Sequence, residues 1–184
     1  NDIIILIIGI TLFIISYNFD QQISLFFKNI KLPFLDAILS VITNFGIIII
    51  VILIIPSFIL YKKNKKLIYL LFLTFIASFI LAFIIKLLVL RQRPIEAFTY
   101  PFMNIINYSF PSMHAMVIFS LLPILIKYLP KQKFFWVSFG LLAISSRIYF
   151  GFHFLSDVVF GALFGYFIGD WLLELYEKGK LWKK

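Results

Sequence analysis

Three long runs without a charged side chain constrain this chain more than any other feature of its sequence. They span Ile3–Phe19, Ala37–Tyr61 and Leu67–Ile85 and hold 17, 25 and 19 residues. A helix needs about 20 mostly apolar residues to cross the hydrocarbon core of a bilayer. Of the 184 residues 62% are hydrophobic, whereas a soluble domain has about half. The sequence therefore predicts a membrane protein, whose first apolar run is a retained helix and not a cleaved signal peptide.

Three further apolar stretches are shorter or interrupted by ionisable residues and lie at roughly 112–130, 134–150 and 156–175. With them we expect six spans. The mixed segment Asp20–Leu35 is expected to form an amphipathic helix in the membrane interface that Pro33 stops, with a plain connecting loop as the alternative. The predicted fold is all-α: a six-transmembrane-helix bundle with an interfacial amphipathic helix between spans one and two, in a single domain over residues 1–184.

The positions of the basic residues predict the orientation. Of 17 lysines and arginines, eleven fall on one side of a six-span chain: Lys62, Lys63, Lys65, Lys66, Lys127, Lys131, Lys133, Lys178, Lys180, Lys183 and Lys184. Cytoplasmic loops carry an excess of such residues, so both termini are expected in the cytoplasm. The net charge of +9 is then mostly a topology signal, and we expect no nucleic-acid partner. The absence of cysteine excludes disulfides and cysteine-bound metals.

Most of the remaining basic residues and both histidines gather in three polar islands at the outer ends of the later spans: Lys86–Pro94, Pro111–His114 and Ser146–Asp157. Ionisable residues at the membrane are costly and usually functional, although each one alone is also compatible with snorkelling or a surface charge. Lys86 and Arg93 would share a face if their helix continued until Pro94 ends it. Two cations on one face suit an anion with several oxygens.

The other two islands add hydrogen-bond donors and a histidine pair. Ser112 is a candidate N-cap of the fourth span, where free backbone N–H groups favour an anion. His153 and Asp157 are four residues apart, so a helical turn would bring the carboxylate to one ring nitrogen and leave the other as nucleophile or base. A His–Asp pair that only caps a helix is the alternative.

Other site chemistries have less support in the sequence. Two histidines and an aspartate could bind zinc, but no H-E-x-x-H motif is present and the neighbouring cations would repel a metal. No Gly-rich phosphate loop or G-x-S-x-G motif supports nucleotide binding or serine hydrolysis. A metal-free anion site without a cofactor is therefore expected.

In order and spacing, the islands resemble the three motifs of the type 2 phosphatidic acid phosphatase (PAP2) superfamily. The motifs K-x6-R-P, P-S-G-H and S-R-x5-H-x3-D are matched by Lys86-x6-Arg93-Pro94, Pro111-Ser112-Met113-His114 and Ser146-Arg147-x5-His153-x3-Asp157. With their flanking spans they cover about residues 67–175. Met113 departs from the pattern, because the family usually has glycine there.

The resemblance implies a role for each matching residue. His153 is expected to be the nucleophile that forms a phosphohistidine, and Asp157 is expected to orient it. His114 is expected to be the general acid for the leaving group and later the base for water. The implied phosphate-binding positions are Lys86, Arg93, Ser112, Met113, Ser146 and Arg147.

The expected activity is metal-independent hydrolysis of a membrane lipid phosphate or diphosphate, at an active site that faces the extracytoplasmic side. Family analogy favours polyprenyl diphosphate, and phosphatidic acid and phosphatidylglycerol phosphate also fit. One alternative is a lipid phosphotransferase, which Met113 favours because a bulky residue after the motif serine also occurs in such enzymes. Another is a non-catalytic lipid-binding or transport protein. A soluble vanadate-type haloperoxidase is excluded by the apolar spans.

Overall fold

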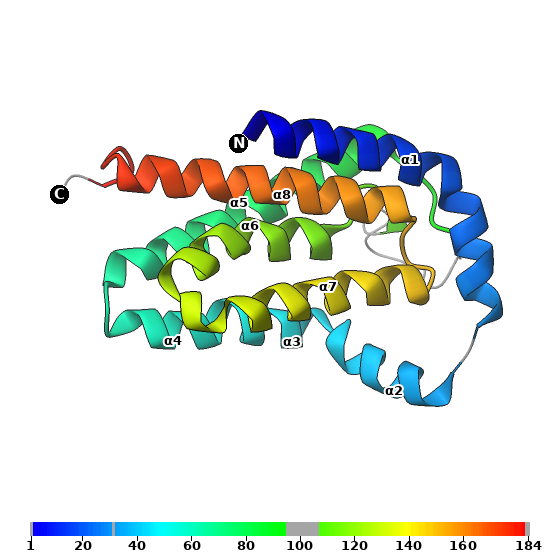
Figure 1. Cartoon of the computed structure of the whole chain (residues 1–184), viewed down its shortest axis with the longest axis horizontal. Coiled ribbons are helices and arrows are strands. Elements are labelled where there is room, and N and C mark those ends of the chain that lie inside the picture. The colour runs from blue at the N-terminus through cyan, green and yellow to red at the C-terminus, as the bar shows by residue number, and fades with distance from the viewer. Residues whose placement is uncertain (1, 31, 95–106, 183–184) are drawn as a thin grey trace.

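The computed structural model describes residues 2–30, 32–94 and 107–182. Every regular element among them is helical, which confirms the all-α prediction. In chain order the elements are α1 (Asp2–Asn29), α2 (Pro33–Ile42), α3 (Phe45–Ile49), the π-helical turn η1 (Ile50–Ile54), α4 (Ile55–Tyr61), α5 (Lys65–Val89), α6 (Met113–Tyr128), the 3-10 turn η3 (Pro130–Gln132), α7 (Lys133–Tyr149) and α8 (Leu155–Glu177). The longer helices run along one axis, and α2 is turned away at one end (Figure 1).

Helix α6 forms the centre of the bundle. Ten of its 16 residues are buried, and it contacts α5, α7 and α8. Outer helices instead expose large apolar side chains, such as Ile7 with 59% and Phe58 with 74% of its surface accessible. Contiguous apolar surface of this kind is unfavourable in water but is solvated by lipid. The bundle is therefore suited to a bilayer on its outer faces.

A row of glycines lets α8 lie directly against α6. Gly161, Gly165 and Gly169 are spaced four residues apart, and a Cβ at the last two would come within 2.2 and 1.8 Å of backbone oxygens of α6. Small residues at this spacing let membrane helices approach backbone to backbone. The resulting register places the first turns of the two helices together, where the Ser112 N–H donates to the Asp157 carbonyl oxygen at 3.0 Å.

Length and composition identify fewer spans than the predicted six. Three helices are long and apolar enough, over Ile3–Asn29, Lys65–Val89 and Leu155–Glu177, and the bent pair of α2 and α3–α4 makes a fourth if it is one span. Helices α6 and α7 hold 16 and 17 residues, or about 24 and 26 Å, against a hydrocarbon core of about 30 Å. The multi-pass architecture is confirmed for the described residues, whereas the exact count of six is not.

The predicted interfacial helix over Asp20–Leu35 is not a separate element. Residues 20–29 continue α1, because no Pro or Gly interrupts this stretch. In Figure 1, α1 bends after its first part, and its later part crosses the end of the bundle. Pro33 is the first residue of α2, so it begins that helix instead of ending the preceding one, in keeping with the preference of proline for the first helical position.

The longest uncharged run contains a break that its composition does not reveal. Helix α2 and the α3–α4 segment meet at Thr43 and Asn44 with a bend of 54°. The side-chain oxygen of Asn44 accepts the N–H groups of Gly46 at 2.9 Å and Ile47 at 3.3 Å and caps α3. Because Thr43 and Asn44 are both uncharged, a hydropathy profile shows no interruption at this break.

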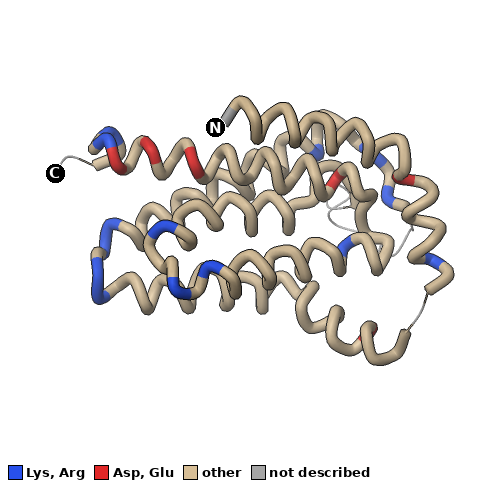
Figure 2. The backbone as a smooth tube through the Cα atoms, viewed as in Figure 1, with Lys and Arg blue, Asp and Glu red and all other residues tan. Residues whose placement is uncertain are grey.

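Charged residues gather at the two ends of the bundle, and the middle carries almost none (Figure 2). One end holds the α4–α5 and α6–α7 turns and the C-terminal end of α8 (Figure 1). The predicted inner lysines belong to these segments, except that Lys183 and Lys184 lie outside the described residues. The opposite end, where α6 and α8 begin, holds the three polar islands.

Candidate active site

The structure brings the three polar islands together at this second end of the bundle. The first island contacts the turn before α6, because Lys86 Nζ donates to the Tyr108 carbonyl oxygen at 2.6 Å. It also contacts the third island, because Arg93 Nη1 donates to the Phe152 carbonyl oxygen at 3.0 Å. The backbone bond between Ser112 and Asp157 joins the second island to the third. Residues far apart in the sequence thus form one cluster.

The prediction that Lys86 and Arg93 share a helical face is wrong. Helix α5 ends at Val89, and Leu90 takes a left-handed conformation with φ of 52°. Arg93 therefore lies beyond the end of α5, and Pro94 does not end the helix. The two cations still converge. Arg93 Nε donates to the Asn107 carbonyl oxygen at 2.9 Å, and Lys86 donates to the carbonyl oxygen of the next residue, Tyr108.

The second island lies where the sequence places it. Ser112 is the N-cap of α6, and its hydroxyl oxygen accepts the Ala115 N–H at 3.5 Å. Met113 opens the helix and is half-buried against the hydrophobic core. Its backbone is helical at this position, so a glycine is not required by the conformation.

His114 and Arg147 meet a residue that the sequence did not single out. His114 Nε2 lies 3.2 Å from the Thr43 carbonyl oxygen, and Arg147 Nη1 donates to the Thr43 hydroxyl at 2.7 Å. Because a carbonyl oxygen can only accept, Nε2 of His114 carries a proton. The His114 ring also packs edge-on against Phe45, and the Arg147 guanidinium lies over the Phe152 ring at 4.4 Å.

Ser146 is buried, and its hydroxyl donates to the Ala143 carbonyl oxygen of its own helix at 2.6 Å. This contact is typical of a serine in a membrane helix, where the backbone of the preceding turn is the nearest acceptor. In the structure, the Ser146 hydroxyl is thus hydrogen-bonded within α7, next to Arg147.

His153 is held by a backbone carbonyl more closely than by its predicted carboxylate partner. Its Nδ1 lies 2.7 Å from the Ser109 carbonyl oxygen, whereas the nearest Asp157 oxygen is 3.7 Å away. His153 precedes α8, so the four-residue helical spacing assumed for the pair does not apply. Since the carbonyl oxygen can only accept, the proton of a neutral ring sits on Nδ1, and Nε2 keeps its lone pair.

The surroundings of His153 favour its neutral form. The side chain is 3% exposed, and this burial lowers the pKa of His153 well below its ordinary value of 6.5. The positive charges of Lys86, Arg147 and Arg93 act in the same direction. A buried, uncharged imidazole thus lies within the electrostatic reach of all three predicted phosphate-binding cations.

Asp157 has two other partners. One carboxylate oxygen accepts the Phe154 N–H at 2.8 Å and caps α8, and the other accepts Arg91 Nη1 at 2.7 Å. Arg91 also donates to Asp20 of α1 at 2.7 Å and to the Ser156 hydroxyl at 2.7 Å. Asp20 in turn accepts the Ser156 N–H at 2.9 Å and its hydroxyl. This buried network ties α1 to the start of α8.

Sequence reasoning missed Ser109, Arg91, Asp20 and Thr43. A backbone carbonyl such as that of Ser109 carries no side-chain signal. Arg91 was visible as one of the few basic residues outside the inner set, and Asp20 as the charge that ends the first apolar run. Their pairing joins residues 71 positions apart in the chain, which spacing cannot foresee.

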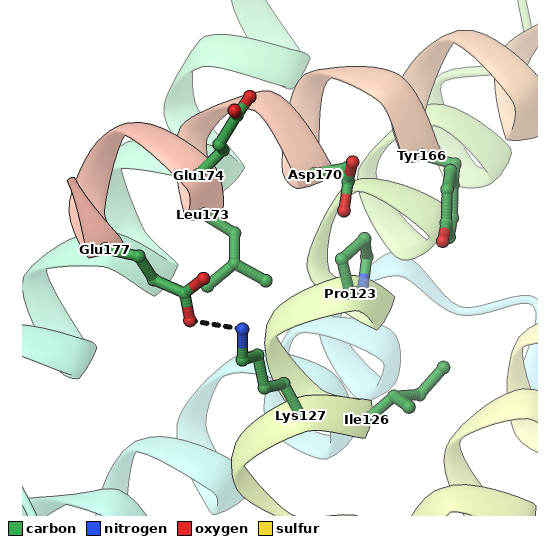
Figure 3. Close-up of a pocket in the computed structure, with 8 residues that line it drawn as sticks. All are labelled: Pro123, Ile126, Lys127, Tyr166, Asp170, Leu173, Glu174 and Glu177. Carbon is green, nitrogen blue, oxygen red and sulfur yellow. Dashed lines mark ion pairs between the residues drawn. The ribbon is translucent and has the colours of Figure 1, made fainter. Parts of the chain in front are cut away.

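A pocket of about 290 Å³ lies elsewhere, between the C-terminal parts of α6 and α8 (Figure 3). Its lining residues are Pro123, Ile126, Lys127, Tyr166, Asp170, Leu173, Glu174 and Glu177. Asp170 follows Asp157 by 13 residues, or about 20 Å along a helix. Lys127 and Glu177 form an ion pair across the pocket. It contains none of the predicted site residues.

The donor set of the candidate site is cationic. Among the residues that the structure describes, no three His, Asp or Glu side chains are grouped so as to hold a metal ion. Lys86, Arg93 and Arg147 instead provide positive groups beside two histidines. Such an arrangement suits an anion with several oxygens, of which a phosphate is the simplest.

A helical membrane bundle in which cations and two histidines cluster at one end is the class of protein that the fold and the candidate site define. The family model of the PAP2 superfamily matches residues 65–180, more than half of the chain. The chain therefore belongs to the PAP2 superfamily, and the motif resemblance is confirmed.

One solved structure is similar over almost the whole chain. It is the crystal structure of the first transmembrane PAP2-type phosphatidylglycerolphosphate phosphatase, from Bacillus subtilis, with a TM-score of 0.73, 22% identity and 96% of each chain covered. At this identity the likeness shows the fold. A search of curated proteins gives no match. Family and fold together support a membrane lipid phosphatase.

Proposed function

We propose that this protein hydrolyses a lipid phosphate or diphosphate through a phosphohistidine on His153, without a metal ion. The observation that carries the proposal is the state of His153. Its Nδ1 is engaged by the Ser109 carbonyl at 2.7 Å, and its lowered pKa leaves Nε2 unprotonated near neutral pH. A nucleophilic lone pair therefore lies beside the cations that a phosphoryl group requires.

In the first proposed step, His153 Nε2 attacks phosphorus, and the bond from phosphorus to the leaving oxygen breaks as the P–N bond forms. The leaving oxygen belongs to the lipid alcohol of a phosphate monoester or to the remaining lipid phosphate of a diphosphate. The negative charge of a bound phosphate favours the protonated form of His114, which gives its Nε2 proton to the leaving oxygen. Lys86, Arg93 and Arg147 offset the charge on the phosphoryl oxygens. Ser112 and the first N–H groups of α6 supply further hydrogen bonds to the anion.

In the second step, water attacks the phosphohistidine and His114 Nε2, now neutral, accepts a proton from it. The P–N bond breaks, inorganic phosphate leaves, and His153 returns to its neutral form. Asp157, at 3.7 Å from the ring, attracts the positive charge that the ring carries while it is phosphorylated. The hydrogen bonds of Asp157 with the Phe154 N–H and with Arg91 also hold the start of α8 in place.

The proposed substrate is a lipid that presents its phosphate at the membrane surface. Polyprenyl diphosphate is favoured by analogy with family members, which is an argument from the fold and not from a contact in this chain. Phosphatidylglycerol phosphate is the second candidate, because the solved structure with the same fold is a phosphatidylglycerolphosphate phosphatase. Phosphatidic acid is the third.

The test is phosphate release from the three lipids by the purified chain in detergent, with and without EDTA. We expect turnover of at least one lipid at a rate that EDTA leaves unchanged. Acid quenching during turnover should trap phosphate on His153, which mass spectrometry of the digested chain detects. Loss of activity with EDTA, restored by a divalent cation, would contradict the metal-free mechanism.

A phosphotransferase on the same scaffold remains the alternative that Met113 favours. The discriminating measurement is product analysis with an added lipid alcohol as acceptor. A phosphotransferase forms the phosphorylated lipid alcohol and releases little phosphate when no lipid alcohol is added. A non-catalytic lipid-binding protein would give neither product.

We propose that the end with the α4–α5 and α6–α7 turns faces the cytoplasm and the candidate site faces outward. The basic residues of those turns support this orientation through the positive-inside rule. Since the chain has no cysteine, single cysteines can report the topology. A membrane-impermeant maleimide should label Gln92→Cys in intact cells and should label Lys131→Cys only after permeabilisation. The reverse pattern would overturn the orientation.

A further inference from the structure

Thr43, in the joint between α2 and α3, contacts the candidate site. Thr43 presents two oxygens to two different site residues. Its carbonyl oxygen faces His114 Nε2 at 3.2 Å, and its hydroxyl accepts from Arg147 Nη1 at 2.7 Å. Both donors are groups that the proposed reaction directs at the phosphate and its leaving oxygen.

The two contacts of Thr43 therefore take the places of phosphate oxygens. A hydroxyl and a carbonyl are neutral acceptors, whereas a phosphate oxygen is charged and forms a stronger hydrogen bond with the same donor. The N–H group of Arg147 that donates to the Thr43 hydroxyl cannot at the same time make a linear hydrogen bond to a phosphate oxygen. Thr43 and a bound phosphate are thus competitors for these donors.

The segment that carries Thr43 is lightly packed. Of the ten residues of α2, Leu39 alone is buried, and Phe34 and Val41 are 75% and 55% exposed. A side-chain contact with the bundle is the hydrogen bond from the Tyr149 hydroxyl to Asp36, at 2.6 Å. Segments with few buried contacts move at low free-energy cost. The 54° joint after α2 is a place where such movement can be absorbed.

We propose that Thr43 occupies the His114 and Arg147 donors in the substrate-free site, and that a lipid phosphate displaces it on binding. The inference rests on the proposed function in assuming that these donors bind phosphate. Thr43 then sets substrate affinity, because each binding event must first break its hydrogen bond to Arg147. Removing the hydroxyl should strengthen phosphate binding, whereas a residue that merely supports the fold would weaken it.

The test compares inorganic orthophosphate binding to the full chain in detergent by isothermal titration calorimetry. Thr43→Val removes the hydroxyl at nearly constant volume, and we expect it to bind orthophosphate about three- to tenfold more tightly than the wild type. Thr43→Ser keeps the hydroxyl and should retain the wild-type affinity. Ser40→Ala is the matched control, because its exposed hydroxyl bonds only to Ala37 within α2.

Equal or weaker orthophosphate binding by Thr43→Val overturns the inference. Thr43→Ala provides a second variant with the same expected sign if the valine variant does not fold. For any lipid that is turned over, KM should fall in parallel. The binding comparison needs no turnover. A wild type that binds orthophosphate but hydrolyses no lipid would refute the proposed function, and the comparison between wild type and Thr43→Val would still test the inference about Thr43.

Discussion

The two ends of the bundle carry similar charged residues in opposite surroundings. At the end with the basic turns, the side chains of Lys178 and Glu174 are 54% and 56% exposed and pair across one helical turn. At the other end, Lys86 is 2% exposed and the Asp157 side chain is fully buried. Exposed pairs contribute little to stability, whereas removing a charge from water costs several kcal/mol per ion unless it is well partnered.

This difference separates the charges from which we infer the topology from the charges to which we assign the proposed chemistry. The exposed lysines lie at the end that the proposed orientation assigns to the cytoplasm. Lys86 and Arg93 at the other end are held by backbone carbonyl oxygens at residues 107, 108 and 152. Neutral acceptors do not cancel a positive charge, so this end retains an electrostatic attraction for an anion.

Replacing the proposed nucleophile, His153, should have the largest effect on activity of the changes compared between the two ends. His153→Ala should reduce phosphate release from lipid substrates by at least about 10³-fold, because the covalent route is removed. Size-exclusion chromatography and circular dichroism in detergent should show an unchanged helical bundle. Phosphate release at the wild-type rate from every lipid would refute the assignment of His153.

A matched pair of lysines tests the comparison directly. Lys86→Gln should lower kcat/KM on the order of 100-fold, because a preorganised donor to the phosphoryl oxygens is lost. Lys178→Gln makes the same chemical change at the exposed end and should leave kcat/KM within about twofold. Equal effects of the two variants would show that burial does not distinguish the functional charges.

The buried network around Arg91 should respond chiefly in stability. Arg91→Gln leaves Asp157 and Asp20 buried without their cation, which should destabilise the chain by about 3 kcal/mol. Asp20→Asn should cost less, because Arg91 keeps Asp157. In a double-mutant cycle followed by thermal unfolding in detergent, the two losses should not add. Strict additivity would mean that the two residues do not interact.

The pH dependence should show the smallest effect. His153 must be neutral to attack, and its pKa lies well below 6.5, so its protonation should not reduce kcat/KM between pH 6.5 and 7.5. Arg147→Gln removes a positive charge, which raises the pKa of His153 and should move the acid limb of the profile to higher pH. Lys133→Gln, at the other end, should leave the limb in place.

The lowered pKa of His153 also predicts how folding stability depends on pH. The unfolded chain takes up a proton on His153 near pH 6.5, whereas the folded chain does not. Folding stability should therefore be fully present above pH 6.5 and should decrease as the pH falls below that value.

Much of this protein could be predicted from its residues in chain order. Long apolar runs determine membrane helices because unpaired backbone groups are intolerable in lipid. Ser112 could be identified as an N-cap from its place before an apolar run. The three motifs could be recognised because their spacing is local, within 12 residues at most. The prediction failed where it relied on helical continuity. Arg93 lies after the end of the helix that carries Lys86, and His153 lies before the start of the helix that carries Asp157.

The three polar islands and their membrane setting were thus determined by the sequence alone, because hydropathy, charge and short spacings are properties of neighbouring residues. The tertiary structure alone decided what holds each catalytic candidate. The Ser109 carbonyl sets the tautomer of His153, Arg91 joins Asp157 to Asp20, and Thr43 faces His114 and Arg147. These contacts use backbone oxygens or residues from distant segments of the chain. No local pattern encodes such contacts, because they exist only once the helices have packed.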